Sequence, residues 1–295
     1  MPLGKIKVGV SGWRYGGWRG VFYPKGLRQR DELRYAAERF DSIEINGTFY
    51  SLQRPELFQQ WHGETPEDFV FALKGGRYIT HMLKLGKVET PLANYFGSGV
   101  LRLGAKLGPI LWQLPPNTRF RPEVLARFFD MLPRTTREAA ALSRRHDHRL
   151  KGRAWTETDA DRPIRHALEI RHESFRDTAF VELLRRHEIA LVVADTVDWP
   201  LLMDATADFV YVRLHGSTQL YASGYGPKAL DRWAARAIAW ASGREAEGEH
   251  VGPPAPRRVS RDVYIYFDND AKVRAPVDAQ SLMRKIEALR RERAG

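Results

Sequence analysis

The chain contains no cysteine among its 295 residues. This absence excludes disulfide bonds, thiolate nucleophiles, cysteine-bound zinc and iron–sulfur clusters held by the chain itself. Glycines follow the first apolar run, but Gly9, Gly12, Gly16, Gly17 and Gly20 match neither the dinucleotide fingerprint nor the P-loop spacing. We therefore expect no nucleotide cofactor, and any metal would need histidine, carboxylate or neutral oxygen ligands.

Long hydrophobic runs are absent as well. No stretch has the length of a membrane span, and residues 1–7 lead into a strand-like run without the apolar segment of a signal peptide. We therefore expect a soluble, cytoplasmic protein that does not enter a membrane. Its content of 43% hydrophobic and 28% charged residues is typical of a globular protein.

The charge is unbalanced toward the basic side, with a formal net charge of +11. Such an excess favours attraction to polyanions, because neutralising phosphates releases counterions. Much of it lies in residues 134–165 and 257–261, where a solvated basic loop is the alternative explanation. Nucleic acid therefore stays open as a partner.

Short apolar runs alternate with helical patterns along the chain. Prolines at 122, 227 and 276 open three of the helical patterns. The alternation predicts parallel βαβ units that close into a single TIM-type (β/α)8 barrel over residues 1–295, with an open doubly wound sheet as the alternative. Charged segments at 137–163 and 244–260 are expected to be insertions or loops. The expected strands are Ile6–Val10, Ser42–Asn46, Phe69–Lys74, Pro109–Gln113, Ala167–Arg171, Ala190–Asp195, Phe209–His215 and Val263–Asp268.

Four of these runs carry polar residues at alternate positions, while the intervening residues are apolar. Side chains on a strand alternate between its two faces, so one face of each run is apolar and the other is polar. Short apolar strands between helices are buried on both faces, which places the polar faces in a shared pocket rather than in water. The pairs are Glu44 and Asn46, Glu169 and Arg171, Arg213 and His215, and Tyr266 and Asp268.

Several motifs together resemble the domain of unknown function 72 family, also called YecE-like. The resemblance spans nearly the whole chain and implies a TIM-type barrel, but it implies no reaction. The motifs are Ser11-Gly12-Trp13, Phe40-Asp41-Ser42-Ile43-Glu44-Ile45-Asn46-Gly47-Thr48-Phe49-Tyr50, Phe71-Ala72-Leu73-Lys74, Trp112-Gln113-Leu114-Pro115-Pro116, Glu169-Ile170-Arg171-His172, Tyr211-Val212-Arg213-Leu214-His215-Gly216 and Phe267-Asp268-Asn269-Asp270.

The expected pocket lies at the carboxyl ends of the strands, where TIM barrels keep their catalytic groups. We expect acid/base chemistry, led by His215, on a small anionic or sugar-phosphate-like molecule. Lys74, Arg171 and Arg213 are expected to hold the anion. The predicted catalytic residues are His215, Glu44, Glu169, Lys74 and Asp268, and the predicted binding residues are Arg171, Arg213, Asn46, Gln113, Asp195, Trp13, Tyr15 and Tyr50.

Other interpretations of the same residues stay open. The charges could pair into a structural network without chemistry, and two carboxylates across a pocket also permit glycoside hydrolysis. Lys74 could form a Schiff base, and the carboxylates with His215 could hold a divalent metal, although three nearby cations argue against it. A nucleic-acid-binding or nucleic-acid-processing barrel and a non-catalytic scaffold are the remaining alternatives.

Overall fold

Eight parallel strands close into a barrel in which each strand pairs with its neighbour in sequence and β1 pairs with β8. The structure is a computed structural model that describes residues 3–216, 220–221 and 223–294. The predicted barrel is confirmed, and the predicted strand ends differ from the observed ones by no more than two residues. The strands are β1 Ile6–Ser11, β2 Ser42–Ile45, β3 Val70–Lys74, β4 Leu107–Gln113, β5 His166–Glu169, β6 Ala190–Asp195, β7 Phe209–Leu214 and β8 Asp262–Phe267.

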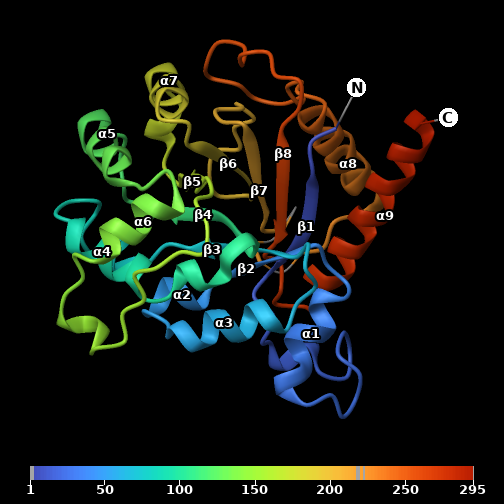
Figure 1. Cartoon of the computed structure of the whole chain (residues 1–295). Helices are drawn as coiled ribbons and strands as arrows, with labels where there is room; N and C mark the ends of the chain where they lie inside the picture. The colour runs from blue at the N-terminus through green and yellow to red at the C-terminus, as the bar shows by residue number, and fades with distance from the viewer. Residues whose placement is uncertain (1–2, 217–219, 222, 295) are drawn as a thin grey trace.

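Helices surround this barrel, and the last two, α8 and α9, lie side by side next to β8 and β1 (Figure 1). Proline occupies the first turn of α3, α5 and α8, where its missing N–H leaves no hydrogen bond unmade. The helices are α1 Glu32–Ala37, α2 Gly47–Tyr50, α3 Pro55–Gly63, α4 Glu89–Gly97, α5 Pro122–Met131, α6 Thr136–Ser143, α7 Thr178–Arg186, α8 Pro227–Ala241 and α9 Ala275–Ala294. Shorter helical turns are η1 Gly16–Trp18, η2 Gln29–Asp31, η3 Tyr78–Met82, η4 Val100–Lys106, η5 His148–Leu150 and η6 Glu173–Phe175.

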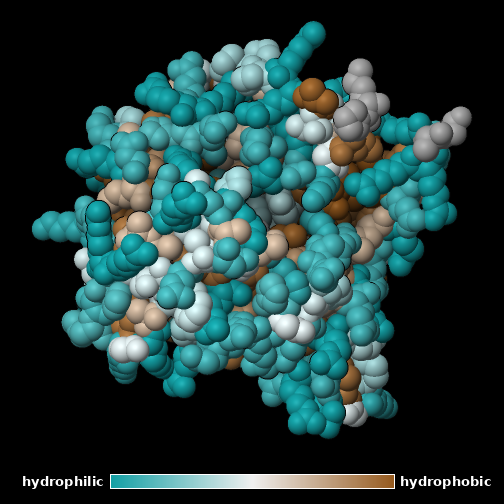
Figure 2. Space-filling view, in the orientation of Figure 1, coloured by the Kyte–Doolittle hydropathy of each residue, from teal (hydrophilic) through white to brown (hydrophobic). Residues whose placement is uncertain are grey.

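The strands are buried on both faces, as their composition predicts. Every residue of β2, β5 and β7 is buried. One set of alternate side chains packs against the helices, and the other fills the barrel with apolar groups that include Ala72, Leu111, Ala167, Val192 and Tyr211. The outer face seen in Figure 2 is mostly hydrophilic, with hydrophobic residues showing mainly in recesses.

The amino end of the barrel is closed by a charged cluster. Arg165 bonds Asp208 at 2.8 Å and Asp262 at 2.7 Å, and it lies 3.3 Å from the Tyr264 hydroxyl. A hollow of about 1380 Å³ opens beside this cluster. Because its arginine is paired with two carboxylates, we assign this end to stability, as is usual for the amino face of TIM barrels.

The charged segment 137–163 is not a loop throughout, because most of α6 lies in it. The Thr135 hydroxyl accepts a hydrogen bond from the Glu138 amide, and the Glu138 carboxylate accepts one from the Arg134 amide. A Thr with a Glu three residues later is a capping-box pattern that predicts a helix start, and this signal was missed. Segment 244–260 contains neither helix nor strand.

Candidate active site

Inward-facing polar side chains meet at the carboxyl ends of the strands. The same alternation that fills the barrel with apolar groups points the last inward residue of several strands into its mouth. These are Ser11 on β1, Glu44 on β2, Lys74 on β3, Gln113 on β4, Glu169 on β5, Arg213 on β7, and Arg171, His215 and Asp268 just beyond the ends of β5, β7 and β8.

Arg213 is the centre of this cluster, and its side chain is only 1% exposed. Its Nη1 donates to Glu169 Oε2 at 2.7 Å, and its Nη2 lies 2.9 Å from both Glu44 Oε1 and Asp268 Oδ2. One guanidinium therefore joins carboxylates from three strands. Such a buried cation needs these partners, because an unpaired charge in this environment is strongly unfavourable.

Glu44 is fully engaged by its neighbours. Besides Arg213, it accepts hydrogen bonds from Ser11 Oγ at 2.6 Å and from the Tyr211 hydroxyl at 2.6 Å. Tyr211 and Ser11 were not predicted as site residues. Tyr211 stands two positions before Arg213 on the same strand face, so the alternation contained the signal for it.

Glu169 is held by two arginines. Arg171 Nε donates to Glu169 Oε1 at 2.7 Å, while Arg213 binds the other oxygen. The Arg171 guanidinium lies 3.7 Å from the Trp199 ring centroid, within cation–π range. Burial alone would raise the pKa of Glu169, but Arg171 and Arg213 outweigh burial and lower that pKa well below its usual range.

His215 and Asp268 form a second unit at the mouth. His215 Nδ1 lies 3.1 Å from Asp268 Oδ2. The imidazole is buried between the rings of Trp199 and Tyr221, whose centroids lie 5.6 and 5.4 Å away. Neither ring nitrogen makes a hydrogen bond of normal geometry among the residues described, so the contact of Nδ1 with Asp268 is a close electrostatic approach. A carboxylate beside Nδ1 favours the tautomer protonated there, which leaves the Nε2 lone pair free to accept a proton.

Lys74 carries the third chemical feature of the mouth. Its Nζ lies 4.5 Å from the Phe49 ring centroid, and no ion pair joins it to a carboxylate among the residues described. Burial, and then the charge of Arg213, lower the pKa of Lys74 to about 8.

Three of the predicted binding residues line the same mouth. Asn46 follows β2 and hydrogen-bonds to Tyr15, while Gln113 is buried next to Glu169 in the β4–β5 register. The Tyr15 hydroxyl donates to the Ser11 carbonyl. Burial and nearby Asp268 raise the pKa of Tyr15, so its hydroxyl stays protonated at neutral pH.

The structure places three other predicted binding residues away from the mouth. Asp195 faces outward with Val193 and bonds Tyr225 and Trp233, because β6 turns only apolar residues inward. Trp13 packs in the core against Trp61, at 5.5 Å between ring centroids. Tyr50 lies on the surface with 69% of its area exposed, because its helix α2 turns it toward solvent.

His81 belongs to the mouth and was missed by the sequence analysis. It lies in η3, the turn after β3, and its ring centroid is 5.1 Å from that of Phe49. Burial, and then Lys74 and Arg171, lower the pKa of His81. No strand alternation extends into this turn, so the sequence contained no period that could place it.

No group of three or more carboxylate or imidazole side chains arranged to hold a metal ion occurs in the described part of the chain. The mouth carboxylates instead have arginine partners. Within the same residues, no helix is both long and apolar enough to cross a membrane.

The fold and the polar mouth define a TIM-barrel protein whose distinctive side chains gather at the carboxyl ends of its strands. The chain matches the family described as "Protein of unknown function DUF72" over residues 7–294 and belongs to that family. The expected family resemblance is therefore confirmed. No reaction is attached to this family description.

Relatives of the chain carry names that state no activity either. It is 29% identical over 131 residues to UPF0759 protein YecE of Escherichia coli K12, across 43% of this chain and 44% of that protein. It is 27% identical over 124 residues to UPF0759 protein YunF of Bacillus subtilis, across 38% of this chain and 40% of that one. The chain thus spans less than half of the length of the curated relatives in these alignments.

Solved structures of the same family share the fold. A DUF72 family protein from Thermotoga maritima superposes with a TM-score of 0.72 at 24% identity, covering 96% of this chain and 99% of that one. One from Enterococcus faecalis gives a TM-score of 0.66 at 16% identity, covering 96% and 95% of the two chains. These similarities support the barrel architecture.

The mouth makes stability depend on pH in a direction that can be measured. Burial would raise the pKa of Asp268, but Arg213 and His215 outweigh it and lower the pKa to about 2. The carboxylate therefore stabilises the fold fully above the ordinary aspartate pKa, and this contribution of roughly 2 kcal/mol is lost as the pH falls toward 2. We expect Asp268→Asn to destabilise the protein at pH 7 and to do so progressively less at pH 4 and pH 3, as measured by urea unfolding.

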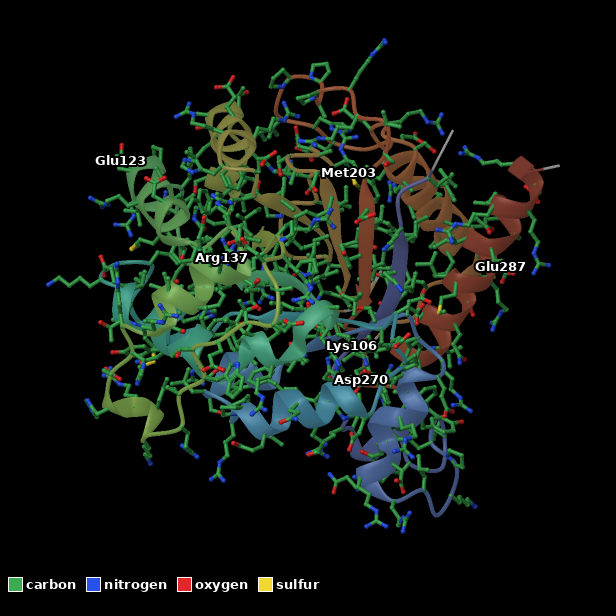
Figure 3. The ribbon with its side chains drawn as sticks, viewed as in Figure 1. Lys106, Glu123, Arg137, Met203, Asp270 and Glu287 are labelled. Atoms are coloured by element: carbon green, nitrogen blue, oxygen red, sulfur yellow. The ribbon has the colours of Figure 1, made fainter. Side chains whose placement is uncertain are left out.

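Asp270 provides a control of opposite sign two residues away. Burial raises the pKa of Asp270 to about 6, although its carboxylate accepts a hydrogen bond from the Trp18 indole. Figure 3 shows this residue beyond the end of β8. Because the pKa of Asp270 is raised in the folded chain, the native protein loses stability as the pH rises from about 4 to 6. The free energy of unfolding of Asp270→Asn should therefore rise relative to that of the native chain over this pH range. Parallel pH curves for the two variants would contradict both assignments.

Proposed function

We propose that this barrel is an enzyme that binds a small anionic molecule in its mouth and acts on it by acid/base chemistry. The observation that carries the proposal is that Lys74, whose ammonium has no carboxylate partner among the described residues, shares the barrel mouth with the His215–Asp268 pair and feels the charge of Asp268. The three mouth carboxylates are engaged by arginines, which leaves this ammonium as a group able to attract an anion.

The residues divide the work by their contacts. Lys74 binds the anionic group, and Arg171, held by Glu169 and stacked on Trp199, presents a second cation at the rim. His215 accepts a proton from the substrate at Nε2, while Asp268 holds the imidazole through Nδ1. Because Glu44 and Glu169 already bind arginine, we assign them to positioning Arg213 and Arg171 rather than to proton transfer. The predicted catalytic role of these two glutamates is therefore not part of the proposal.

The binding step is tested with Lys74→Met, which keeps an unbranched side chain one atom shorter and removes the charge. We expect calorimetric titration to detect at least one ligand among inorganic phosphate, citrate and ribose 5-phosphate. Loss of a charge-assisted hydrogen bond of about 1.5–3 kcal/mol should then weaken that binding by roughly 10- to 100-fold.

Lys25→Met is the matched control, because Lys25 is exposed and its loss changes the net charge by the same amount. It should bind the same anion as well as the native chain does. Equal weakening in both variants would mean that overall charge attracts the anion, and unchanged binding in Lys74→Met would remove the proposed site.

A nucleic-acid-binding function is the second candidate, because aromatic rings are exposed on the turns after β2 and β3. Tyr50 is 69% exposed and Tyr78 is 39% exposed, with the Arg149 guanidinium 5.5 Å from the Tyr78 ring centroid. Such rings can stack on unpaired bases. A ten-nucleotide oligothymidylate in the same titrations distinguishes this candidate. Oligonucleotide binding that falls steeply with rising salt and is weakened by Tyr50→Ala would favour the nucleic-acid function over binding of a small anion.

A further inference from the structure

Lys74 lies close to several carboxylates that are not available to it. Arg213 binds Glu44, Glu169 and Asp268, and Arg171 takes the remaining oxygen of Glu169. In the part of the chain that the structure describes, no carboxylate oxygen forms an ion pair with Lys74 Nζ. Arg171 and Arg213 stay charged at all accessible pH values and are paired with the carboxylates. Lys74 is therefore the basic side chain of this cluster that can lose its proton.

The surroundings of Lys74 make its neutral amine more accessible than that of an ordinary lysine, although the ammonium remains the major form at pH 7. Its Nζ faces the Phe49 ring, and the same ring is contacted by the His81 imidazole at 5.1 Å between centroids. With a pKa of about 8, the Lys74 amine is uncharged in roughly a tenth of the molecules at pH 7, a far larger fraction than for an ordinary lysine. His81, whose pKa is lowered, is a neutral imidazole on the same Phe49 ring as this amine, which makes it the proton carrier we assign to the reaction.

Burial also lowers the pKa of a second lysine, Lys106, but the partners of its nitrogen are different. Lys106, labelled in Figure 3, is also buried, but its ammonium donates to the carbonyl oxygens of His62 at 2.5 Å and Thr65 at 2.7 Å. All of its hydrogen-bonding capacity serves the structure around the start of β4. Lys74 differs because its nitrogen faces the mouth and an aromatic ring instead of carbonyl groups.

We propose that Lys74 forms an imine with the carbonyl group of its substrate, which narrows the substrate class to small anionic aldehydes and ketones. This inference rests on the proposed function of the mouth. The amine nitrogen attacks the carbonyl carbon, the carbonyl oxygen takes up a proton, and the resulting carbinolamine loses one water to give the C=N bond. No oxidant or reductant is needed. Arg171 at the rim holds the anionic group of the same substrate, and His81 carries the protons.

Borohydride trapping tests this reaction on the intact chain. Glyoxylate and pyruvate serve as anionic carbonyl probes and glycolaldehyde as a neutral one. Reduction fixes an imine as a stable secondary amine, which peptide mass mapping assigns to a residue. We expect labelling at Lys74 to be at least tenfold faster than at Lys106 or Lys25, to be faster with the anionic probes, and to rise with pH with a midpoint near 8. Labelling spread evenly over the lysines would overturn the inference.

Lys74→Arg is the negative control for the adduct. Arginine has no amine that can form an imine, so this variant should show no adduct at position 74, and anion binding is measured separately on the native chain. If the native chain binds the anion and forms no adduct at Lys74, the imine is wrong and the proposed anion site stands. If adducts form at Lys74 only with glycolaldehyde and no anion binds, the anionic substrate class fails.

Discussion

Replacing Arg213 with methionine should lower the free energy of unfolding by about 3–5 kcal/mol, the usual cost of removing one partner from a buried ion pair. The loss is large because Glu44, Glu169 and Asp268 all depend on this one guanidinium. Urea unfolding at pH 7, followed by circular dichroism, measures the change. The free energy of unfolding of Arg213→Lys should lie between those of Arg213→Met and the native chain, because a compact ammonium cannot pair with three carboxylates at once.

Arg162→Met is the surface control for this experiment. Arg162 makes two 2.7 Å contacts with Asp159, so it resembles Arg213 in geometry while remaining partly exposed. Surface pairs of this kind contribute about 1 kcal/mol or less. If both methionine variants lost the same small amount, the mouth cluster would not hold the ends of β2, β5, β7 and β8 together, and the positioning role given to Glu44 and Glu169 would fail.

If Arg213→Met does not fold, a double variant still tests the idea. Glu44→Gln combined with Arg213→Met removes a stranded charge together with its former partner. The double variant should recover part of the loss, because the cost comes from buried carboxylates left without a cation. No recovery would mean that the methionine itself disrupts the packing.

The strand alternation is sufficient to place most of the charged residues of the mouth. Side chains on a strand have a period of two residues, and eight parallel strands end at one rim, so Glu44, Glu169, Arg213 and Asp268 are brought together by the sequence pattern alone. The same alternation places Asp195 on the outer face of β6, because Val193, two positions earlier, packs on the outer side of the barrel. Asp195 is therefore excluded from the mouth. Including it in the pocket gave too much weight to its charge and too little to its position.

Loop residues could not be placed in this way. Trp13, Tyr50 and His81 lie outside the strands, in loops and short helices whose side chains follow no two-residue period. The result differed for each: Trp13 entered the core, Tyr50 turned to solvent, and His81 was directed to the Phe49 ring by η3. The strand alternation therefore placed the charged residues at the mouth, whereas of the predicted aromatic residues Tyr15 lines the mouth and Trp13 and Tyr50 do not.

Replacing His215 with glutamine should lower kcat by about 100- to 10,000-fold, the usual contribution of a positioned acid or base. KM should change little, because the anion is bound by Lys74 and Arg171 in the proposed site. The measurement uses the member of the anion panel that the native chain turns over. His187→Gln provides the control, since His187 lies at the end of α7, away from the mouth.

A structural role for His215 would give a different result in a measurement that needs no substrate. The 3.1 Å approach of Asp268 to Nδ1 favours the tautomer with its proton there, so the nitrogen-15 NMR shift of Nε2 should be that of an unprotonated ring nitrogen. Asp268→Asn should shift the tautomer population, because an amide no longer selects the Nδ1–H form. A protonated Nε2 in the native chain would make it a donor instead of an acceptor, and the proposed direction of proton transfer would then be wrong.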